Sequence, residues 1–72
     1  METKETIAII VNGESKEAAS GSTVAQLLET LGLRSGRVAI ERNLLILPRS
    51  EWTTTQVAAG DRYEIVQFVG GG

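Results

Sequence analysis

The chain has 72 residues, which is enough for one domain around a single core. It contains no histidine and no cysteine, so the usual general base, the thiol nucleophile and the ligands of zinc or iron–sulfur sites are missing. Seven basic and nine acidic residues give a net charge of −2, which does not favour binding to nucleic acid through its phosphates. We therefore expect a protein with no catalytic side chains, no metal and no bound cofactor.

The sequence also predicts no association with a membrane. Its longest uninterrupted apolar run, residues 7–11, is far shorter than the ~20 residues of a membrane-spanning helix and shorter than the core of a signal peptide. We expect a cytoplasmic protein.

A β-hairpin is predicted first. Thr6–Val11 is rich in isoleucine and valine, which favour strands. Asn12-Gly13 follows, and this pair tolerates the positive φ angles of a type I′ turn. Glu14–Ala19 is polar and has a weak strand propensity, so its pairing depends on the turn and on the first strand. We interpret Asn12-Gly13 as a turn with no other role.

A helix is predicted over residues 24–31. Thr23 is a suitable N-cap, and Gln26 lies three residues later, where it completes a capping box. Gly32 stands where a left-handed residue would end the helix. One apolar stripe at helical spacing is formed by Val24, Leu27, Leu28 and Leu31.

Two more strands are predicted over residues 38–41 and 44–47. The pair Arg42-Asn43 between them suits a tight connection, and Pro48 ends the second strand.

Residues 49–56 have no clear period, and Trp52 is expected to anchor this segment to the core. Gly60-Asp61 predicts a turn, and residues 63–69 form the last predicted strand.

The order strand, strand, helix, strand, strand, strand predicts an α+β fold of the β-grasp type. In this layout the first and last strands are parallel neighbours in a mixed sheet, and the helix packs across one face.

The chain passes from its last strand into Gly70, Gly71 and Gly72. Glycines without side chains are expected to be flexible, so we predict a domain over residues 1–69 and a flexible tail over residues 70–72. Such a tail is able to enter a narrow channel in a partner and present the carboxylate of Gly72. A carboxylate is a poor electrophile, so ATP held by the partner would first convert it to an acyl adenylate, and a sulfur nucleophile would then give a thiocarboxylate.

The sequence resembles the ThiS family of sulfur carriers, within the ThiS/MoaD group of ubiquitin-like proteins. The pieces that carry the resemblance are Val11-Asn12-Gly13, Gly21-Ser22-Thr23-Val24 with Leu27-Leu28, residues 38–43, Pro48-Arg49 with Trp52, Gly60-Asp61, and residues 64–66 with 68–72. The resemblance implies a ubiquitin-like β-grasp protein in the thiazole branch of thiamine biosynthesis. The resemblance also implies that the protein is a carrier and not itself an enzyme.

The resemblance also implies the partners and the modified residue. An E1-like adenylyltransferase of the ThiF type would use ATP to adenylate Gly72, a sulfur donor protein would supply the sulfur, and a ThiG-type thiazole synthase would receive it. Gly71 belongs to the functional ending. Gly70 departs from a bare Gly-Gly ending and is expected only to lengthen the tail.

Other side chains leave alternatives open. Val66 and Phe68 share one face of the last strand, where they are either a docking patch for the activating enzyme or, for Phe68, ordinary core. The arginines are expected to be mostly solvated, with contact to acidic groups of a partner as the alternative for Arg42, Arg49 and Arg62.

Three other functions fit the same tail. The first is the small subunit of molybdopterin synthase, although residues 38–43 and 48–52 favour the thiamine branch. The second is a ubiquitin-like modifier, whose last glycine is joined to lysines of target proteins. The third is a β-grasp interaction module with an inert tail.

Overall fold

The computed structural model describes residues 5–33 and 37–68, which form one sheet, one α-helix and one 3-10 helix. The elements are β1 (Thr6–Val11), β2 (Glu14–Ala19), α1 (Val24–Thr30), β3 (Val38–Arg42), β4 (Leu45–Ile46), η1 (Arg49–Glu51) and β5 (Arg62–Gln67). Every strand and the helix predicted from the sequence are present. Within the described ranges, no helix is long and apolar enough to cross a membrane.

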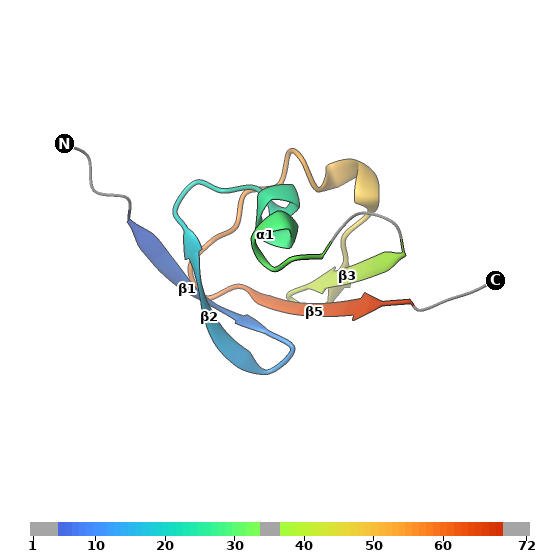
Figure 1. The fold of residues 1–72 in the computed structure, drawn as a ribbon, viewed down its shortest axis with the longest axis horizontal. Helices are drawn as coiled ribbons and strands as arrows, with labels where there is room; N and C mark the ends of the chain where they lie inside the picture. The colour runs from blue at the N-terminus through green and yellow to red at the C-terminus, as the bar shows by residue number, and fades with distance from the viewer. Residues whose placement is uncertain (1–4, 34–36, 69–72) are drawn as a thin grey trace.

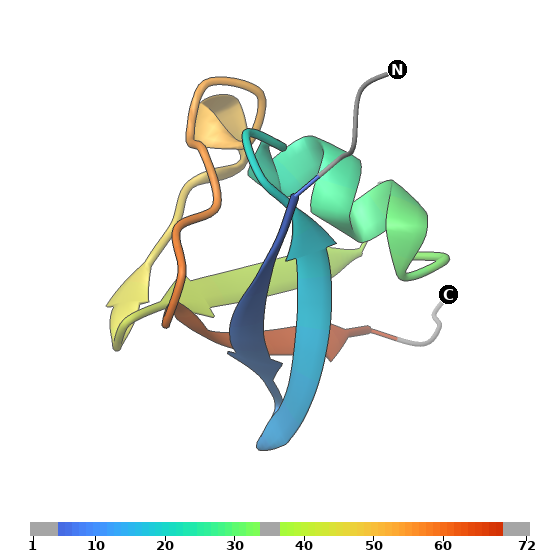
Figure 2. The ribbon, with the colours of Figure 1, turned by 90° about the vertical axis from the view of Figure 1, so that its left-hand side faces the viewer.

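The sheet has the order β2-β1-β5-β3-β4. β1 and β5 are parallel, and the other neighbouring pairs are antiparallel. The predicted central pairing of the first and last strands is therefore confirmed. Helix α1 lies across one face of this sheet, and no other described element covers the opposite face (Figures 1 and 2).

The β1–β2 hairpin closes through the predicted turn. Asn12 has φ 51° and Gly13 has φ 83°, which are the left-handed conformations of a type I′ turn. The register pairs Val11 with Glu14 and Thr6 with Ala19, so the polar second strand is paired along its whole length.

Helix α1 begins and ends as the sequence predicts. The Thr23 hydroxyl accepts from the Gln26 amide at 3.2 Å, and the Gln26 side chain accepts from the Thr23 amide at 2.9 Å, which completes the capping box. At the other end Gly32 has φ 80°. The Leu33 amide then donates to the Leu28 carbonyl at 2.9 Å, which forms a Schellman motif.

The core lies between α1 and the sheet. Its most deeply buried side chains are Ile9, Val24, Leu27, Ile40 and Tyr63. Trp52 is buried beside them, and its indole N–H donates to the Leu47 carbonyl at 3.2 Å. The predicted anchoring of the segment after β4 is thereby confirmed.

The β3–β4 connection lies one residue later than the sequence predicts. Asn43 and Leu44 form the turn, with φ 53° and 73°, while Arg42 is the last residue of β3 and pairs with Leu45. The predicted turn at Arg42-Asn43 was wrong because Arg42 is held in the sheet opposite Tyr63 of β5. Strand β4 is consequently only two residues long.

Candidate functional site

Strand β5 leads to the part of the chain in which the sequence places the function. It lies between β1 and β3, with Gln67 opposite Val38. The Phe68 amide then donates to the Arg37 carbonyl at 2.7 Å, so pairing continues one residue past the strand. The predicted tail, Gly70, Gly71 and the reactive Gly72, lies outside the described residues.

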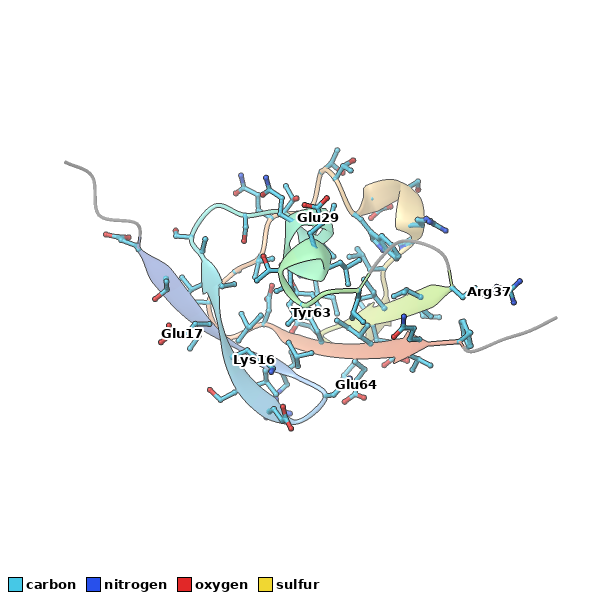
Figure 3. The ribbon with its side chains drawn as sticks, viewed as in Figure 1. Lys16, Glu17, Glu29, Arg37, Tyr63 and Glu64 are labelled. Atoms are coloured by element: carbon cyan, nitrogen blue, oxygen red, sulfur yellow. The ribbon has the colours of Figure 1, made fainter. Side chains whose placement is uncertain are left out.

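The two faces of β5 differ in burial. Tyr63 and Ile65 point to the helix and are buried, whereas Glu64 points away from it (Figure 3). Val66 and Phe68 lie on the same side as Glu64 and are 52% and 55% exposed. Phe68 is therefore not part of the core, and both candidate docking residues are open to a partner.

A buried carboxylate fixes the start of β5. Asp61 is 5% exposed, and each of its oxygens accepts hydrogen bonds. Oδ2 accepts from the Tyr63 hydroxyl at 2.8 Å, and Oδ1 accepts from the Asn43 side chain at 3.2 Å. The Ala58 amide at 2.9 Å and the Arg42 guanidinium at 3.0 Å complete the set. The carboxylate thus joins the β3–β4 turn to the loop that precedes β5.

This environment changes the acidity of two groups. Burial disfavours the charge on Asp61, but hydrogen bonds from Ala58, Tyr63, Asn43 and Arg42 outweigh it and hold the pKa of Asp61 below its usual value. Burial, together with the hydrogen bond to Asp61, raises the pKa of Tyr63 to about 12. Both groups therefore keep their ordinary charge states near neutral pH, which indicates a structural rather than a catalytic role.

Two arginine predictions are resolved by contacts within the chain. Arg42 forms an ion pair with Asp61 at 3.0 Å, so it is an exception to the expectation that most of these arginines are solvated. The Arg49 guanidinium lies 5.5 Å from the centre of the Trp52 ring, a cation–π distance. Arg62 is exposed on β5.

The interpretation of Asn12 as a turn residue with no other role was wrong. Its side chain accepts from the Ile65 amide at 2.8 Å and donates to the Ile65 carbonyl at 3.1 Å, as a further backbone amide of β1 would. Asn43 binds the other side of β5, because its side chain accepts from the Arg62 amide at 2.9 Å and its backbone amide donates to the Arg62 carbonyl at 2.8 Å. The two turn asparagines hold β5 from both sides.

The topology and the exposed strand end define a ubiquitin-like β-grasp protein. A crystal structure of the thiamine biosynthesis protein ThiS from Geobacter metallireducens superposes with a TM-score of 0.77 at 32% identity, covering 92% of this chain and all of that one (100%). The model of the ThiS family matches residues 9–72, a range that includes the three terminal glycines. The chain belongs to the ThiS family.

The curated relatives include a sulfur carrier protein and thiazole synthases. The sulfur carrier protein ThiS of Escherichia coli is 36% identical over 64 residues, which are 89% of this chain and 97% of that protein. The thiazole synthase of Paramagnetospirillum magneticum is 45% identical over 64 residues, again 89% of this chain. The chain spans only 20% of that thiazole synthase and 20% of a second one, from Magnetococcus marinus.

Proposed function

We propose that this chain is a sulfur carrier protein of thiamine biosynthesis, in which the Gly72 carboxylate is the reactive group. The observation that carries the proposal is the match of the ThiS family model through Gly72, which follows the last residue of the central strand β5 by five residues in the sequence. The printed name of the Escherichia coli relative, a sulfur carrier protein, supports the same activity.

The chemistry proceeds in two steps on a partner enzyme. A carboxylate oxygen of Gly72 attacks the α-phosphate of ATP, pyrophosphate leaves, and an acyl adenylate forms. Hydrosulfide released by a sulfur donor protein then attacks the acyl carbon, a C–S bond replaces the C–O bond to AMP, and AMP leaves, so the end becomes a thiocarboxylate. The sequence contains no cysteine or histidine, so an adenylyltransferase of the E1-like, ThiF type supplies the catalytic groups.

A ThiG-type thiazole synthase is the proposed acceptor of the sulfur. Support comes from the thiazole synthases of Paramagnetospirillum magneticum and Magnetococcus marinus, each of which contains a segment similar to this chain. In this scheme the folded domain presents Val66 and Phe68 to the activating enzyme while the tail reaches its active centre.

The mass of the intact chain tests the proposal. After incubation with a ThiF-type enzyme, ATP and a sulfur donor, we expect one oxygen to be replaced by sulfur within Gly72. A variant lacking Gly71 and Gly72 serves as the control and should remain unchanged. An unchanged mass of the full chain, with an enzyme preparation that converts its own ThiS protein, would refute the proposal.

A further inference from the structure

The β1–β2 turn carries a reactive pair of residues that the proposed function does not use. Asn12 and Gly13 are both exposed, and a Cβ added to Gly13 would meet nothing within 4 Å beyond its chain neighbours. The turn projects from the sheet on the side away from α1 (Figures 1 and 2). Since glycine has no side chain to shield its backbone nitrogen, an asparagine that precedes glycine is especially open to attack by that nitrogen.

The reaction available to this pair is closure of a cyclic imide followed by hydrolysis. Hydroxide removes the amide proton of Gly13, and the nitrogen attacks Cγ of Asn12. A C–N bond forms, the Cγ–Nδ2 bond breaks, and ammonia leaves with a proton from water, which restores the hydroxide. Water then opens the imide. Cleavage of the bond to Cγ leaves aspartate, whereas cleavage of the bond to the Asn12 carbonyl carbon leaves isoaspartate, whose backbone runs through the side chain.

The backbone of the folded turn holds the reacting atoms apart. Asn12 has φ 51°, in the left-handed region, where ψ is about +47°. With this ψ the Gly13 nitrogen lies on the opposite side of the Cα–C bond from Cβ of Asn12. Closure of the imide requires both atoms on the same side, so the type I′ turn must open before the reaction.

Hydrogen bonds to β5 hold the side chain as well. Asn12 Oδ1 accepts from the Ile65 amide at 2.8 Å, and Nδ2 donates to the Ile65 carbonyl at 3.1 Å. The backbone amide of Asn12 donates to the Tyr63 carbonyl at 2.8 Å. Rotation of the side chain towards Gly13 breaks both bonds with Ile65, a buried residue, and leaves its backbone groups without these partners. The folded domain thus protects Asn12 in two ways, although the residue is exposed.

We propose that Asn12-Gly13 is a self-modification site, which reacts when Asn12 separates from β5 and whose products do not restore the contact. Either product places a carboxylate oxygen where Nδ2 now donates to the Ile65 carbonyl, so two acceptors would face each other. Isoaspartate also adds a backbone atom to the turn. The reaction is therefore an irreversible mark on chains that have opened, and a marked chain no longer holds β5, the strand that precedes Gly72, from this side.

The unaltered chain tests the protection. It is incubated in mildly alkaline buffer with and without denaturant, below the pH range in which Tyr63 ionises, and is then digested with trypsin. Residues 5–16 carry Asn12 and residues 43–49 carry Asn43, so the mass of each fragment reports the exchange of NH2 for OH separately. We expect Asn12 to react at least about ten-fold faster in denaturant, since only opened molecules react in buffer. Equal rates with and without denaturant would overturn the proposal.

Asn43 is the matched control within the same chain. It also has a positive φ, 53°, and its side chain accepts from the Arg62 amide at 2.9 Å, but Leu44 follows it instead of glycine. The side chain of Leu44 hinders attack by its nitrogen, so Asn43 should stay largely unmodified in both solutions. Reaction of Asn43 as fast as Asn12 in denaturant would show that the glycine confers no special reactivity, and the assigned site would be lost.

Asn12→Asp tests the consequence, because aspartate is the milder product and keeps the backbone intact. We expect chemical denaturation of this variant at neutral pH to have a lower midpoint than that of the unaltered chain. Gln67→Glu, the same change of amide to carboxylate at an exposed residue of β5, is the control and should leave the midpoint nearly unchanged. A midpoint of Asn12→Asp no lower than that of this control would overturn the loss of contact, and its failure to fold would support it.

Discussion

Asp61 remains charged inside the domain because four hydrogen-bond donors surround its carboxylate. Two of these donors come from the end of β3 and the turn that follows it, and two come from residues close to Asp61 in sequence. Loss of the charge would leave the guanidinium of Arg42 without its partner in a half-buried position. The cost of such a loss is larger than that of an exposed ion pair.

We predict that Asp61→Asn lowers the free energy of unfolding by about 2–4 kcal/mol. Chemical denaturation at neutral pH measures this change, and Glu29→Gln, an exposed carboxylate, is the control with an expected change below about 0.5 kcal/mol. A loss for Asp61→Asn no larger than that of the control would show that the buried charge does not stabilise the fold.

Asp61 also determines how the free energy of unfolding changes at acidic pH. The folded-state pKa of Asp61 is lowered, so its contribution to stability is present above the unfolded value of about 4 and is lost as pH falls through the folded value. The Asn variant should therefore lose less stability between neutral pH and acid than the unaltered chain.

At the scale of elements, the β3–β4 turn carries an unusual residue. Leu44 has φ 73° and is 85% exposed, so a large apolar side chain occupies a left-handed conformation without packing in the domain. This conformation costs an L-residue roughly 1–2 kcal/mol. Glycine avoids that cost but loses about 0.5–1 kcal/mol through the entropy of the unfolded chain.

We predict that Leu44→Gly stabilises the domain by about 0.5–1 kcal/mol, the difference between these two effects. Thermal or chemical unfolding measures the change. Leu45→Gly, in β4 and without a positive φ, is the matched control and should destabilise by a similar amount. Destabilisation by both variants would mean that strain at Leu44 is negligible.

Elements with local sequence patterns were predicted well. The capping box at Thr23, the type I′ turn at Asn12-Gly13 and the end of the helix at Gly32 all depend on contacts within a few residues. The β3–β4 turn was misplaced because Leu44 is not a residue type that indicates a left-handed conformation. The second role of Asn12 was missed because its partner, Ile65, is 53 residues away.

At the scale of the whole molecule, the β-grasp layout and the central pairing of the first and last strands were predictable from the order of the elements, since a single amphipathic helix requires a sheet to cover it. The alternation of side chains along the last strand predicted which residues share a face. Which of the two faces the helix covers became clear only from the burial of Tyr63 and Ile65. The contacts of Asp61 with Arg42 and Asn43 were not predictable, since a turn aspartate is usually solvated. The prediction that Gly72 is the reactive residue came from the family resemblance and from the three glycines at positions 70–72.

Tyr63 links the stability of the whole domain to alkaline pH. Its folded-state pKa of about 12 lies above the unfolded value of about 10, so stability is fully present below pH 10 and is lost between these values, by roughly 2–3 kcal/mol. Tyr63 is the only tyrosine, so tyrosinate absorbance reports it alone. We predict ionisation near pH 12 in the folded chain and near pH 10 in denaturant.

Tyr63→Phe is the control for this titration. It should abolish the absorbance change and remove the alkaline loss of stability that belongs to this group. Ionisation of the folded chain near pH 10 would show that the hydroxyl is neither buried nor bonded to Asp61.

The position of β5 has a consequence for biosynthesis. The hairpin of β1 and β2 and the pair of β3 and β4 have no strand-to-strand hydrogen bonds with each other, because β5 lies between them. β5 follows both pairs in the sequence, so the growing chain holds two unjoined half-sheets until the ribosome has made β5. Nascent chains interrupted before β5 therefore cannot complete this sheet.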